Sequence, residues 1–342
     1  MNPPLLAHSR SMILKAAGPI SDHPLRFQAF EPRPPASGEI LLQIAACGVC
    51  RTDLQIVEGA IAPHKIPIIP GHQIVGRVVS VGADVTELRP GDRVGVGWLA
   101  SACGNCDQCK EGRENLCRQA RFTGWDCDGG YATHAIVRAS ATFPIPERFA
   151  DQEAAPLLCG GVIGYRSLKR SKIKPGGKLG LFGFGASALI TIQIARHWGC
   201  RVFVCTRSEK EQTEAKRLGA EWAGSYEDRP PELLDAAITF APVGDVVIAA
   251  LHACDRGATI AINAIHLDHV PEFSYDDLWW ERSLVSVANY TRADAKEFLE
   301  LAAEIPVRTV FDVFDLEDAN VALERLSAGQ LHGAAVLRMN QK

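Results

Sequence analysis

Apolar and polar residues alternate over short stretches in the first part of the chain. Runs typical of β-strands occupy residues 39–44, 74–81 and 93–96. Turn signals such as Pro90-Gly91-Asp92 separate them. This part, which extends to about residue 160, is also rich in Gly and Pro. It predicts a small, irregular β-barrel or sandwich.

From residue 176 onward the pattern changes, and apolar strands alternate with helical periodicity. The expected strands are residues 179–182, 201–205, 236–240, 258–262 and 284–287, and the expected helices are residues 186–198 and 209–218. Such alternation predicts an α/β fold with a doubly wound parallel sheet.

The last part of the chain has a third pattern. Helical periodicity covers residues 294–303 and 316–326, and a strand is expected at 334–338. We therefore predict a first domain at 1–162, a dinucleotide-binding domain at 163–298, and a segment at 299–342 that returns to the first domain.

Composition narrows the possible functions. The 342 residues are 47% hydrophobic, which is enough for two cores. The formal charge is −4 and Lys and Arg are scattered, so we expect no nucleic-acid partner. No apolar run reaches membrane-spanning length, so we expect no membrane partner. The first residues lack a cationic stretch followed by an apolar core, so we expect a cytoplasmic protein.

Four of the eleven cysteines gather in a lobe at about residues 98–118. Without an export signal, cysteines indicate metal binding more than a disulfide framework. The four, Cys103, Cys106, Cys109 and Cys117, can surround one tetrahedral ion. An S4 set suits zinc or an iron–sulfur cluster.

A dinucleotide fingerprint follows the first strand of the α/β part. Gly183 and Gly185, with Ala188 as the third small residue, form G-x-G-x-x-A before a helix that begins at Ala186. The first glycine permits the tight turn, and the second lets the main chain approach a pyrophosphate. The third small residue lets helix and strand pack closely.

The end of the second strand predicts which dinucleotide binds. NAD sites usually carry an acidic residue there, whereas this chain has Thr206, Arg207 and Ser208. Arg207 can pair with a 2′-phosphate, so we predict NADP(H) rather than NAD(H). Alternatively, Arg207 is a solvated surface charge and Glu209 binds the ribose.

Three further candidate ligands are ambiguous from spacing alone. Cys50 could form a redox pair with Cys47. His72 could be a core histidine and Cys159 a small buried hydrophobe.

A resemblance changes this interpretation. Several motifs occur in the order that is typical of one family: Gly48-Val-Cys-Arg-Thr-Asp53, Pro70-Gly-His72, Pro90-Gly-Asp-Arg-Val94, the four-cysteine lobe, Gly129-Gly-Tyr-Ala132 and the Gly183 fingerprint. From about residue 12 to 339 the chain resembles the zinc-dependent medium-chain alcohol dehydrogenases, especially the cinnamyl-alcohol-dehydrogenase type. The resemblance implies a GroES-like catalytic domain and a Rossmann coenzyme domain.

The resemblance also implies roles for these residues. Cys50, His72 and Cys159 would hold a catalytic zinc, and Asp53 would orient His72. Thr52 would hydrogen-bond the alcohol and pass on its proton. The four cysteines of the lobe would hold a structural zinc, giving two Zn²⁺ per chain, and Cys47 would not be a ligand. Relatives suggest a homodimer or homotetramer.

The implied activity is the interconversion of primary alcohols and aldehydes, with hydride transfer to or from NADP(H). Trp98 and Trp125 fall where the family lines its pocket, which suggests aromatic or medium-chain substrates; alternatively, both are core residues. Trp279 and Trp280 suggest packing or a subunit interface. Two other functions remain open, a polyol or sugar dehydrogenase and a non-catalytic protein that binds NADPH and zinc.

The chain departs from the family pattern at three places. Gln73 replaces the usual Glu near the zinc, and Gln55 replaces a histidine that relays protons. Gly333-Ala334-Ala335 replaces a Gly-Arg segment that reaches the pyrophosphate. The helix N-terminus at Ala186, with Arg292 as a candidate substitute, would then carry more of the phosphate charge.

Overall fold

The computed structural model describes residues 9–264 and 267–339. The chain divides into two compact units. Unit 1 consists of Met1–Cys159, Thr291–Glu300 and Thr309–Lys342, and unit 2 of Gly160–Tyr290 and Leu301–Arg308. No described helix is long and apolar enough to cross a membrane. All eleven cysteines, which lie within the described ranges, are free thiols.

The main sheet of unit 1 has the strand order β16-β17-β3-β4-β5-β9, and β8 also pairs with β3. The bounds are β3 Glu39–Val49, β4 Gln73–Val81, β5 Arg93–Val96, β8 His134–Arg138, β9 Thr142–Pro144, β16 Phe311–Asp315 and β17 Ala334–Arg338. Two smaller antiparallel pairs are β1 Arg10–Leu14 with β2 Leu25–Ala29, and β6 Leu99–Ser101 with β7 Arg121–Phe122.

The three strands predicted for the first part are confirmed, but the first continues beyond residue 44. Residues 46–49 of β3 pair with β17, the C-terminal strand, and residues 46–48 also pair with β4. The strand is longer because a partner from the far end of the chain satisfies its main-chain groups. Its end at Val49 delivers Cys50 directly to the start of a helix.

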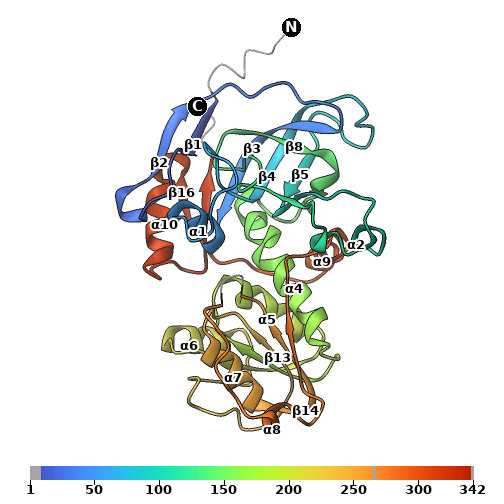
Figure 1. Cartoon of the computed structure of the whole chain (residues 1–342), viewed down its shortest axis with the longest axis vertical. Helices are drawn as coiled ribbons and strands as arrows, with labels where there is room; N and C mark the ends of the chain where they lie inside the picture. Colours follow the sequence, from blue (N-terminus) through green and yellow to red (C-terminus); the bar gives the residue numbers. More distant parts are fainter. Residues whose placement is uncertain (1–8, 265–266, 340–342) are drawn as a thin grey trace. The chain divides into compact units, whose positions relative to one another are not determined.

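The helices of unit 1 are short, apart from α9. Unit 1 contains α1 Arg51–Glu58, α2 Asp107–Lys110, α3 Asp151–Ala154, α10 Ala319–Ser327 and the first part of α9 Arg292–Glu304. Its 3-10 turns are η2 Ile20–Asp22, η3 Glu114–Leu116, η4 Ala139–Ala141, η5 Ala155–Leu158 and η6 Leu316–Asp318. The helix predicted at 316–326 therefore begins as η6 and continues as α10, which packs beside α1 (Figure 1).

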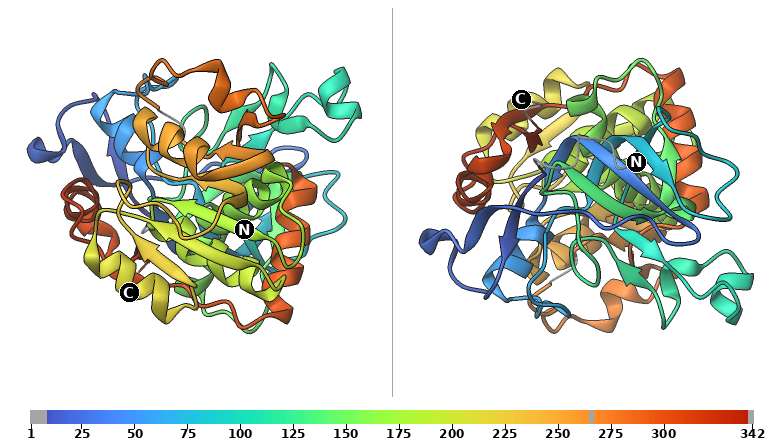
Figure 2. Two further views of the ribbon diagram at one scale, coloured as in Figure 1. Left: turned by 90° about the horizontal axis from the view of Figure 1, so that it is seen from below. Right: turned by 90° about the horizontal axis from the view of Figure 1, so that it is seen from above.

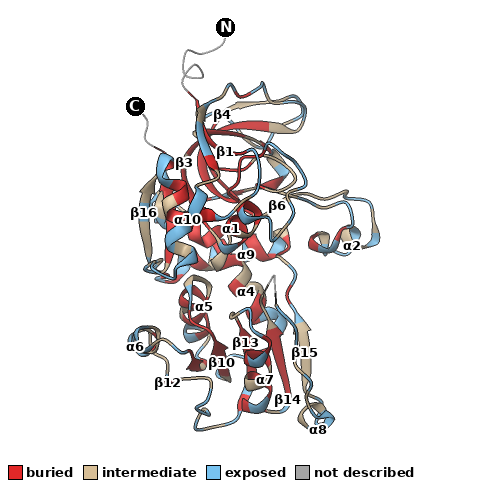
Figure 3. Ribbon diagram, turned by 60° about the vertical axis from the view of Figure 1, so that its left-hand side comes forward, coloured by how far each residue is buried: buried red, intermediate tan, exposed pale blue. Residues whose placement is uncertain are grey.

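The core of unit 1 lies along β3 and β4. Most of β3 and residues 73–76 of β4 are buried (Figure 3), and Ile40, Leu42, Ile44 and Ile74 are at most 1% exposed. By contrast, the lobe that carries α2 stands out from the rest of its unit, in turquoise in both views of Figure 2. Among its cysteines, only Cys117 is fully buried.

Unit 2 is a parallel sheet with the strand order β12-β11-β10-β13-β14-β15. Its strands are β10 Lys178–Phe182, β11 Arg201–Cys205, β12 Trp222–Gly224, β13 Leu234–Thr239, β14 Cys254–Ile262 and β15 Ser283–Ser286. Its helices are α4 Gly160–Ser171, α5 Ala186–His197, α6 Glu209–Arg217, α7 Gly244–Ala253 and α8 Tyr275–Leu278. The order reverses between β10 and β13, which is the switch point of a doubly wound fold. The predicted fold class is confirmed.

Candidate active site

Three ligand atoms from distant parts of unit 1 meet at one point. Cys50 precedes α1, His72 precedes β4, and Cys159 follows η5. Their sulfur and nitrogen atoms all lie within 4.8 Å of one another. His72 is 1% exposed, while both cysteines are half-buried. Three protein ligands, with room for a fourth, are the ligand set of a catalytic zinc site.

The distances fit a tetrahedral ion. Zn–S bonds of about 2.3 Å place two sulfur ligands about 3.8 Å apart, and a sulfur and an imidazole nitrogen about 3.5 Å apart. Cys50 Sγ lies 3.9 Å from Cys159 Sγ, and His72 Nε2 lies 3.4 Å from Cys159 Sγ. These two distances match a tetrahedral zinc site, and the remaining pair of ligand atoms lies within 4.8 Å.

A buried carboxylate, that of Asp53, orients the ligand residues through hydrogen bonds. Asp53 is 0% exposed, and its Oδ1 lies 2.9 Å from His72 Nδ1. Main-chain N–H groups of Cys50 and Gly71 donate to the same carboxylate at 2.8 and 3.2 Å, and the Tyr131 hydroxyl donates at 3.3 Å. With Nδ1–H bound to Asp53, Nε2 is the ring nitrogen that faces Cys159 and can bind a metal once it has lost its proton.

Charge in the site also favours a metal. Hydrogen bonding with Cys159, and then His72, lowers the pKa of the Cys50 thiol well below its usual range. Burial opposes a charge on His72, yet Asp53 and Cys50 together raise the pKa of His72 to about 10. Zinc binds thiolates and neutral imidazole, so binding would use the Cys50 thiolate and release the His72 proton.

Glycine is required just before His72. Gly71 has φ +97°, and a β-carbon there would lie 2.3 Å from Cδ1 of Tyr131. Pro70-Gly-His72 thus brings Tyr131 close enough to donate to Asp53. Sequence reasoning missed this role of Tyr131, although the Gly-Gly-Tyr segment was a signal that could have indicated it.

The other predicted residues lie close to the three ligands or beside them in sequence. Thr52 is 3% exposed, and its Oγ1 lies 3.9 Å from Cys50 Sγ. Gln73 is buried at the start of β4, and its side chain lies over Gly48, where a β-carbon would be 2.7 Å from Gln73 Oε1. Gln55 lies on α1, three residues after Thr52, and is half-buried. Cys47 is fully buried in the core beside them.

A row of rings extends from His72. Trp98 meets the His72 ring edge-on with centroids 4.9 Å apart, and Trp125 stacks on Trp98 at 5.9 Å. Phe122 stacks on both tryptophans, and His64, not identified from the sequence, stacks on Trp125 at 4.0 Å. Both tryptophans are half-buried and also pack against the core of unit 1.

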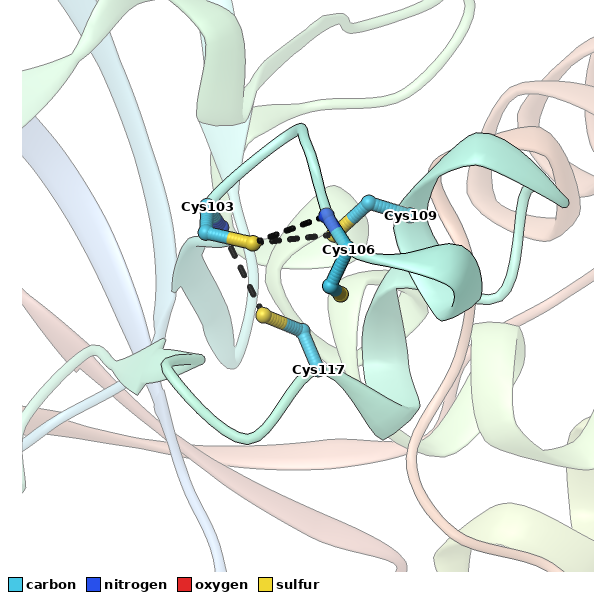
Figure 4. Close-up of side chains that lie close together, drawn as sticks. All are labelled: Cys103, Cys106, Cys109 and Cys117. Carbon is cyan, nitrogen blue, oxygen red and sulfur yellow. Dashed lines mark hydrogen bonds between the residues drawn. The ribbon is translucent and has the colours of Figure 1, made fainter.

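The four cysteines of the lobe form a second cluster, whose side chains converge in Figure 4. Their sulfur atoms lie within 4.8 Å of one another, with Cys103 Sγ and Cys109 Sγ 3.9 Å apart. Main-chain N–H groups of Asn105 and Cys106 lower the pKa of the Cys103 thiol to about 6. This cluster fits a tetrahedral zinc and supplies all four of its ligands.

Arg292 lies beside this lobe, where its main-chain N–H donates to Glu114 Oε1 at 2.6 Å. Glu114 belongs to η3, between the third and fourth cysteines. The contact ties the start of α9 to the lobe.

The dinucleotide fingerprint has the expected local geometry in unit 2. Gly183, after β10, has φ +95°, and a β-carbon there would lie 3.0 Å from the main-chain nitrogen of Ala241. Gly185 precedes α5, where a β-carbon would meet nothing within 4 Å. Ala186 is the first residue of α5, and Ala188 is fully buried. The open space at Gly185 suits a pyrophosphate at the helix N-terminus.

The three residues after β11 differ in exposure. Thr206 is 3% exposed, Arg207 is exposed, and Ser208 caps α6 by accepting from the Glu211 N–H at 3.3 Å. The Arg207 guanidinium is thus accessible to a ligand, and the Ser208 hydroxyl, which accepts from the helix, keeps its proton for a second hydrogen bond.

Comparisons with known proteins agree with this geometry. The family model "Alcohol dehydrogenase GroES-like domain" matches residues 36–147, and "Zinc-binding dehydrogenase" matches residues 188–304. The chain is 46% identical to the "Probable alcohol dehydrogenase AdhA" of Mycobacterium tuberculosis (strain CDC 1551 / Oshkosh), over 98% of this chain and 99% of that protein. It is 33% identical to an alcohol dehydrogenase of Geobacillus stearothermophilus, over 93% and 97% of the two chains.

A solved structure is also similar. The cinnamyl alcohol dehydrogenase of Sorghum bicolor superimposes with a TM-score of 0.87 at 26% identity, covering 96% of this chain and 97% of that one.

Proposed function

We propose a coenzyme and a substrate class for this chain, which belongs to the zinc-dependent medium-chain alcohol dehydrogenases of the cinnamyl-alcohol-dehydrogenase type. As an alcohol dehydrogenase it acts on small-molecule alcohols or aldehydes. The proposal is that it interconverts primary alcohols, aromatic or of medium chain length, with their aldehydes and prefers NADP(H).

One observation carries the catalytic assignment. Cys50, His72 and Cys159 form a set of three ligands with tetrahedral spacing, and Asp53 holds the imidazole in the tautomer that a metal needs. A substrate oxygen would complete the set. Zinc, when bound there, supplies a Lewis acid to that oxygen, and a bound nicotinamide accepts or donates the hydride.

The chain's own residues would control the proton. In alcohol oxidation the substrate loses a hydride from carbon and a proton from oxygen. The Thr52 hydroxyl, buried beside Cys50, would accept the hydrogen bond from the substrate hydroxyl and pass the proton toward solvent. In aldehyde reduction the same hydroxyl would return a proton to the substrate oxygen.

The coenzyme preference is proposed from Arg207. Its exposed guanidinium, at the end of β11, can pair with the 2′-phosphate of NADP(H). The main chain at Gly183, Gly185 and Ala186 would bind the pyrophosphate. Measuring kcat/KM with both coenzymes tests the preference, and a higher value with NAD(H) would contradict it.

A second zinc is proposed for the lobe, where four thiol sulfurs leave no ligand position open. Its role would be structural. Metal analysis of the purified protein should then give two zinc ions per chain, one for each cluster.

The substrate class is proposed from the aromatic row. Trp98 and Trp125 extend outward from His72 as parallel rings, with an interplanar angle of 13°. Stacked apolar rings beside the three ligands suit planar or medium-length carbon chains better than polyols.

We also propose a homodimer or homotetramer. The outer edge of β15 carries no partner strand among the described residues. Near it, Trp279 and Trp280 are 53% and 44% exposed. An exposed strand edge beside large exposed apolar side chains is typical of a surface that pairs with another copy. Light scattering of the purified protein would test this assembly.

The decisive experiment is an NADPH-oxidation assay across a panel of aldehydes. Aromatic and medium-chain aldehydes should be reduced faster than sugars. Cys159→Ser serves as the control, because it removes one of the three ligands. Activity that survives Cys159→Ser would overturn the zinc mechanism.

A further inference from the structure

The end of β11 contains a carboxylate that the coenzyme assignment does not use. Thr206, the buried residue after this strand, is held by three hydrogen bonds. Its hydroxyl donates to Glu211 Oε2, its N–H donates to Gly224 O at 2.8 Å, and its carbonyl accepts from Gln212 Nε2 at 2.8 Å. These three hydrogen bonds fix the position of Thr206.

Glu211 is equally well placed. It is the third residue of α6, and its N–H donates to the Ser208 cap. In a Ser-x-x-Glu capping box, the Glu carboxylate commonly returns to the N–H of the capping residue. Here the carboxylate receives the Thr206 hydroxyl instead, so it faces the last turn of the strand.

Two residues of opposite charge, Arg207 and Glu211, therefore lie near the end of β11. Burial raises the pKa of the Tyr226 phenol, Glu211 raises it further, and Arg207 acts in the opposite direction. A hydrogen bond involving Thr206 also lowers the pKa of this phenol. Arg207 directly follows Thr206 in the chain and Glu211 is hydrogen-bonded to Thr206, so both charged residues adjoin the end of β11.

The direction of the Thr206 hydrogen bond matters for coenzyme choice. A hydroxyl has one proton, and this one already goes to Glu211. Its oxygen can still accept a hydrogen bond from a ribose 2′-hydroxyl. It cannot donate to a phosphate oxygen unless the bond to Glu211 breaks, and the carboxylate also repels the phosphate charge.

We propose that Glu211 is a specificity-determining residue that restrains the preference for NADP(H) and keeps the ribose 2′-hydroxyl of NAD(H) acceptable. The inference rests on the proposed role of Arg207. Arg207 attracts a 2′-phosphate, and Glu211 opposes it, so specificity is the difference between two competing contacts.

Binding of two nucleotide fragments tests this inference without relying on catalysis. The dissociation constants of 2′,5′-ADP and 5′-AMP are measured by calorimetry for the wild-type protein and for Glu211→Gln. The amide keeps the shape of the side chain and an acceptor for Thr206, but removes the charge. The affinity for 2′,5′-ADP should rise about fivefold relative to that for 5′-AMP.

Glu214→Gln is the matched control. Glu214 lies on the same helix but faces Arg217, to which it is bonded at 2.6 and 2.7 Å. Its replacement should leave the ratio of the two affinities unchanged. An unchanged ratio in Glu211→Gln, or an equal change in Glu214→Gln, would overturn the proposal.

Thr206→Val provides a second, independent variant. It removes the acceptor for the 2′-hydroxyl, so 5′-AMP should bind about fivefold more weakly while 2′,5′-ADP binding stays the same. Weaker 2′,5′-ADP binding would show that Thr206 donates to the phosphate, contrary to the proposal.

Arg207→Ala separates this inference from the proposed function. If wild-type protein binds 2′,5′-ADP no better than 5′-AMP, and Arg207→Ala changes nothing, the NADP(H) assignment fails. The shift between wild type and Glu211→Gln is measured in the same assay, and it supports or contradicts the role of Glu211 on its own.

Discussion

Unit 1 contains two sets of metal-ligand side chains that are built in opposite ways. The lobe takes four cysteines from one stretch, residues 103–117, and offers a complete tetrahedron. The other set takes Cys50, His72 and Cys159 from three separate parts of the chain and offers three ligands. A local, complete set suits a metal that only holds structure. A dispersed, incomplete set suits a metal that must accept a substrate.

The two sets also differ in what supports the ligands. In the lobe, main-chain N–H groups of Cys106 and Gln119 donate to cysteine sulfurs at 3.4 Å. In the dispersed set, the buried Asp53 carboxylate connects His72 to the start of α1. Local main-chain geometry therefore shapes the lobe, whereas tertiary packing shapes the three-ligand site.

The largest effect is expected from removing a ligand of the dispersed set. Cys50→Ser should lower kcat/KM by about 10³-fold or more, because Lewis acidity contributes several kcal/mol to the reaction. Zinc content should fall from two ions to one per chain. Serine is also a good helix N-cap, so the variant should keep the Tm of the wild type. Steady-state kinetics, metal analysis and thermal unfolding test the three expectations.

A smaller effect is expected from replacing Asp53, which is hydrogen-bonded to the ligand His72. Asp53→Asn keeps the shape of the side chain but removes the charge that orients His72. Metal affinity or activity should fall by about 10- to 100-fold, as is typical when the partner of a ligating histidine is replaced.

Tyr131→Phe is the control for Asp53→Asn. It deletes one of the four hydrogen bonds to the Asp53 carboxylate and leaves the carboxylate itself in place. Its effect on metal affinity should be several times smaller. Equal losses in the two variants would show that the hydrogen-bond network, rather than the charge, supports the histidine.

The lobe should respond in stability rather than in rate. Cys117→Ser removes a ligand that is buried at 7% exposure, so the second zinc should be lost and Tm should fall by roughly 10 °C. The kcat of the protein that remains folded should change less than about threefold, because the lobe offers no ligand position to a substrate. A loss of kcat as large as in Cys50→Ser, measured below the Tm, would contradict the structural role proposed for the lobe.

The contrast between the local cluster and the dispersed set also explains which site residues the sequence could predict. Four cysteines at close spacing predict a metal cluster by themselves, because neighbouring residues can meet without help from the fold. Cys50, His72 and Cys159 are ambiguous alone, since their meeting depends on β3, β4 and η5. The family resemblance supplied that information. The hydrogen bond from Tyr131 to Asp53 was missed for the same reason, because it joins residues 78 positions apart.

Secondary structure follows a similar rule. The strands at 93–96, 201–205 and 334–338 were predicted to the residue, and each has a clear apolar run. Helix α7 was missed because it is apolar on most of its surface and lacks the 3.6-residue alternation of an amphipathic helix. The extension of β3 to Val49 depends on pairing with β17, which no local pattern reveals.

The smallest effect is expected next to the three-ligand site, at Gln55. This residue lies three positions after Thr52 on α1, so the two share neighbouring positions on the helix surface. An amide does not titrate near neutral pH, so the proposed route for the proton runs from Thr52 through the coenzyme ribose and water. Gln55→His would add a base with an ordinary pKa of about 6.5.

Above that pKa the imidazole is neutral and can take up the proton, so alcohol oxidation by Gln55→His should rise about threefold at pH 7–8. At pH 5.5 the ring is charged, and the two proteins should have the same rate. Gln55→Asn controls for the change in side-chain size and should keep the wild-type pH profile. An unchanged profile in Gln55→His would mean that proton release does not limit oxidation. The glutamine at position 55 would then leave the rate of oxidation unaffected.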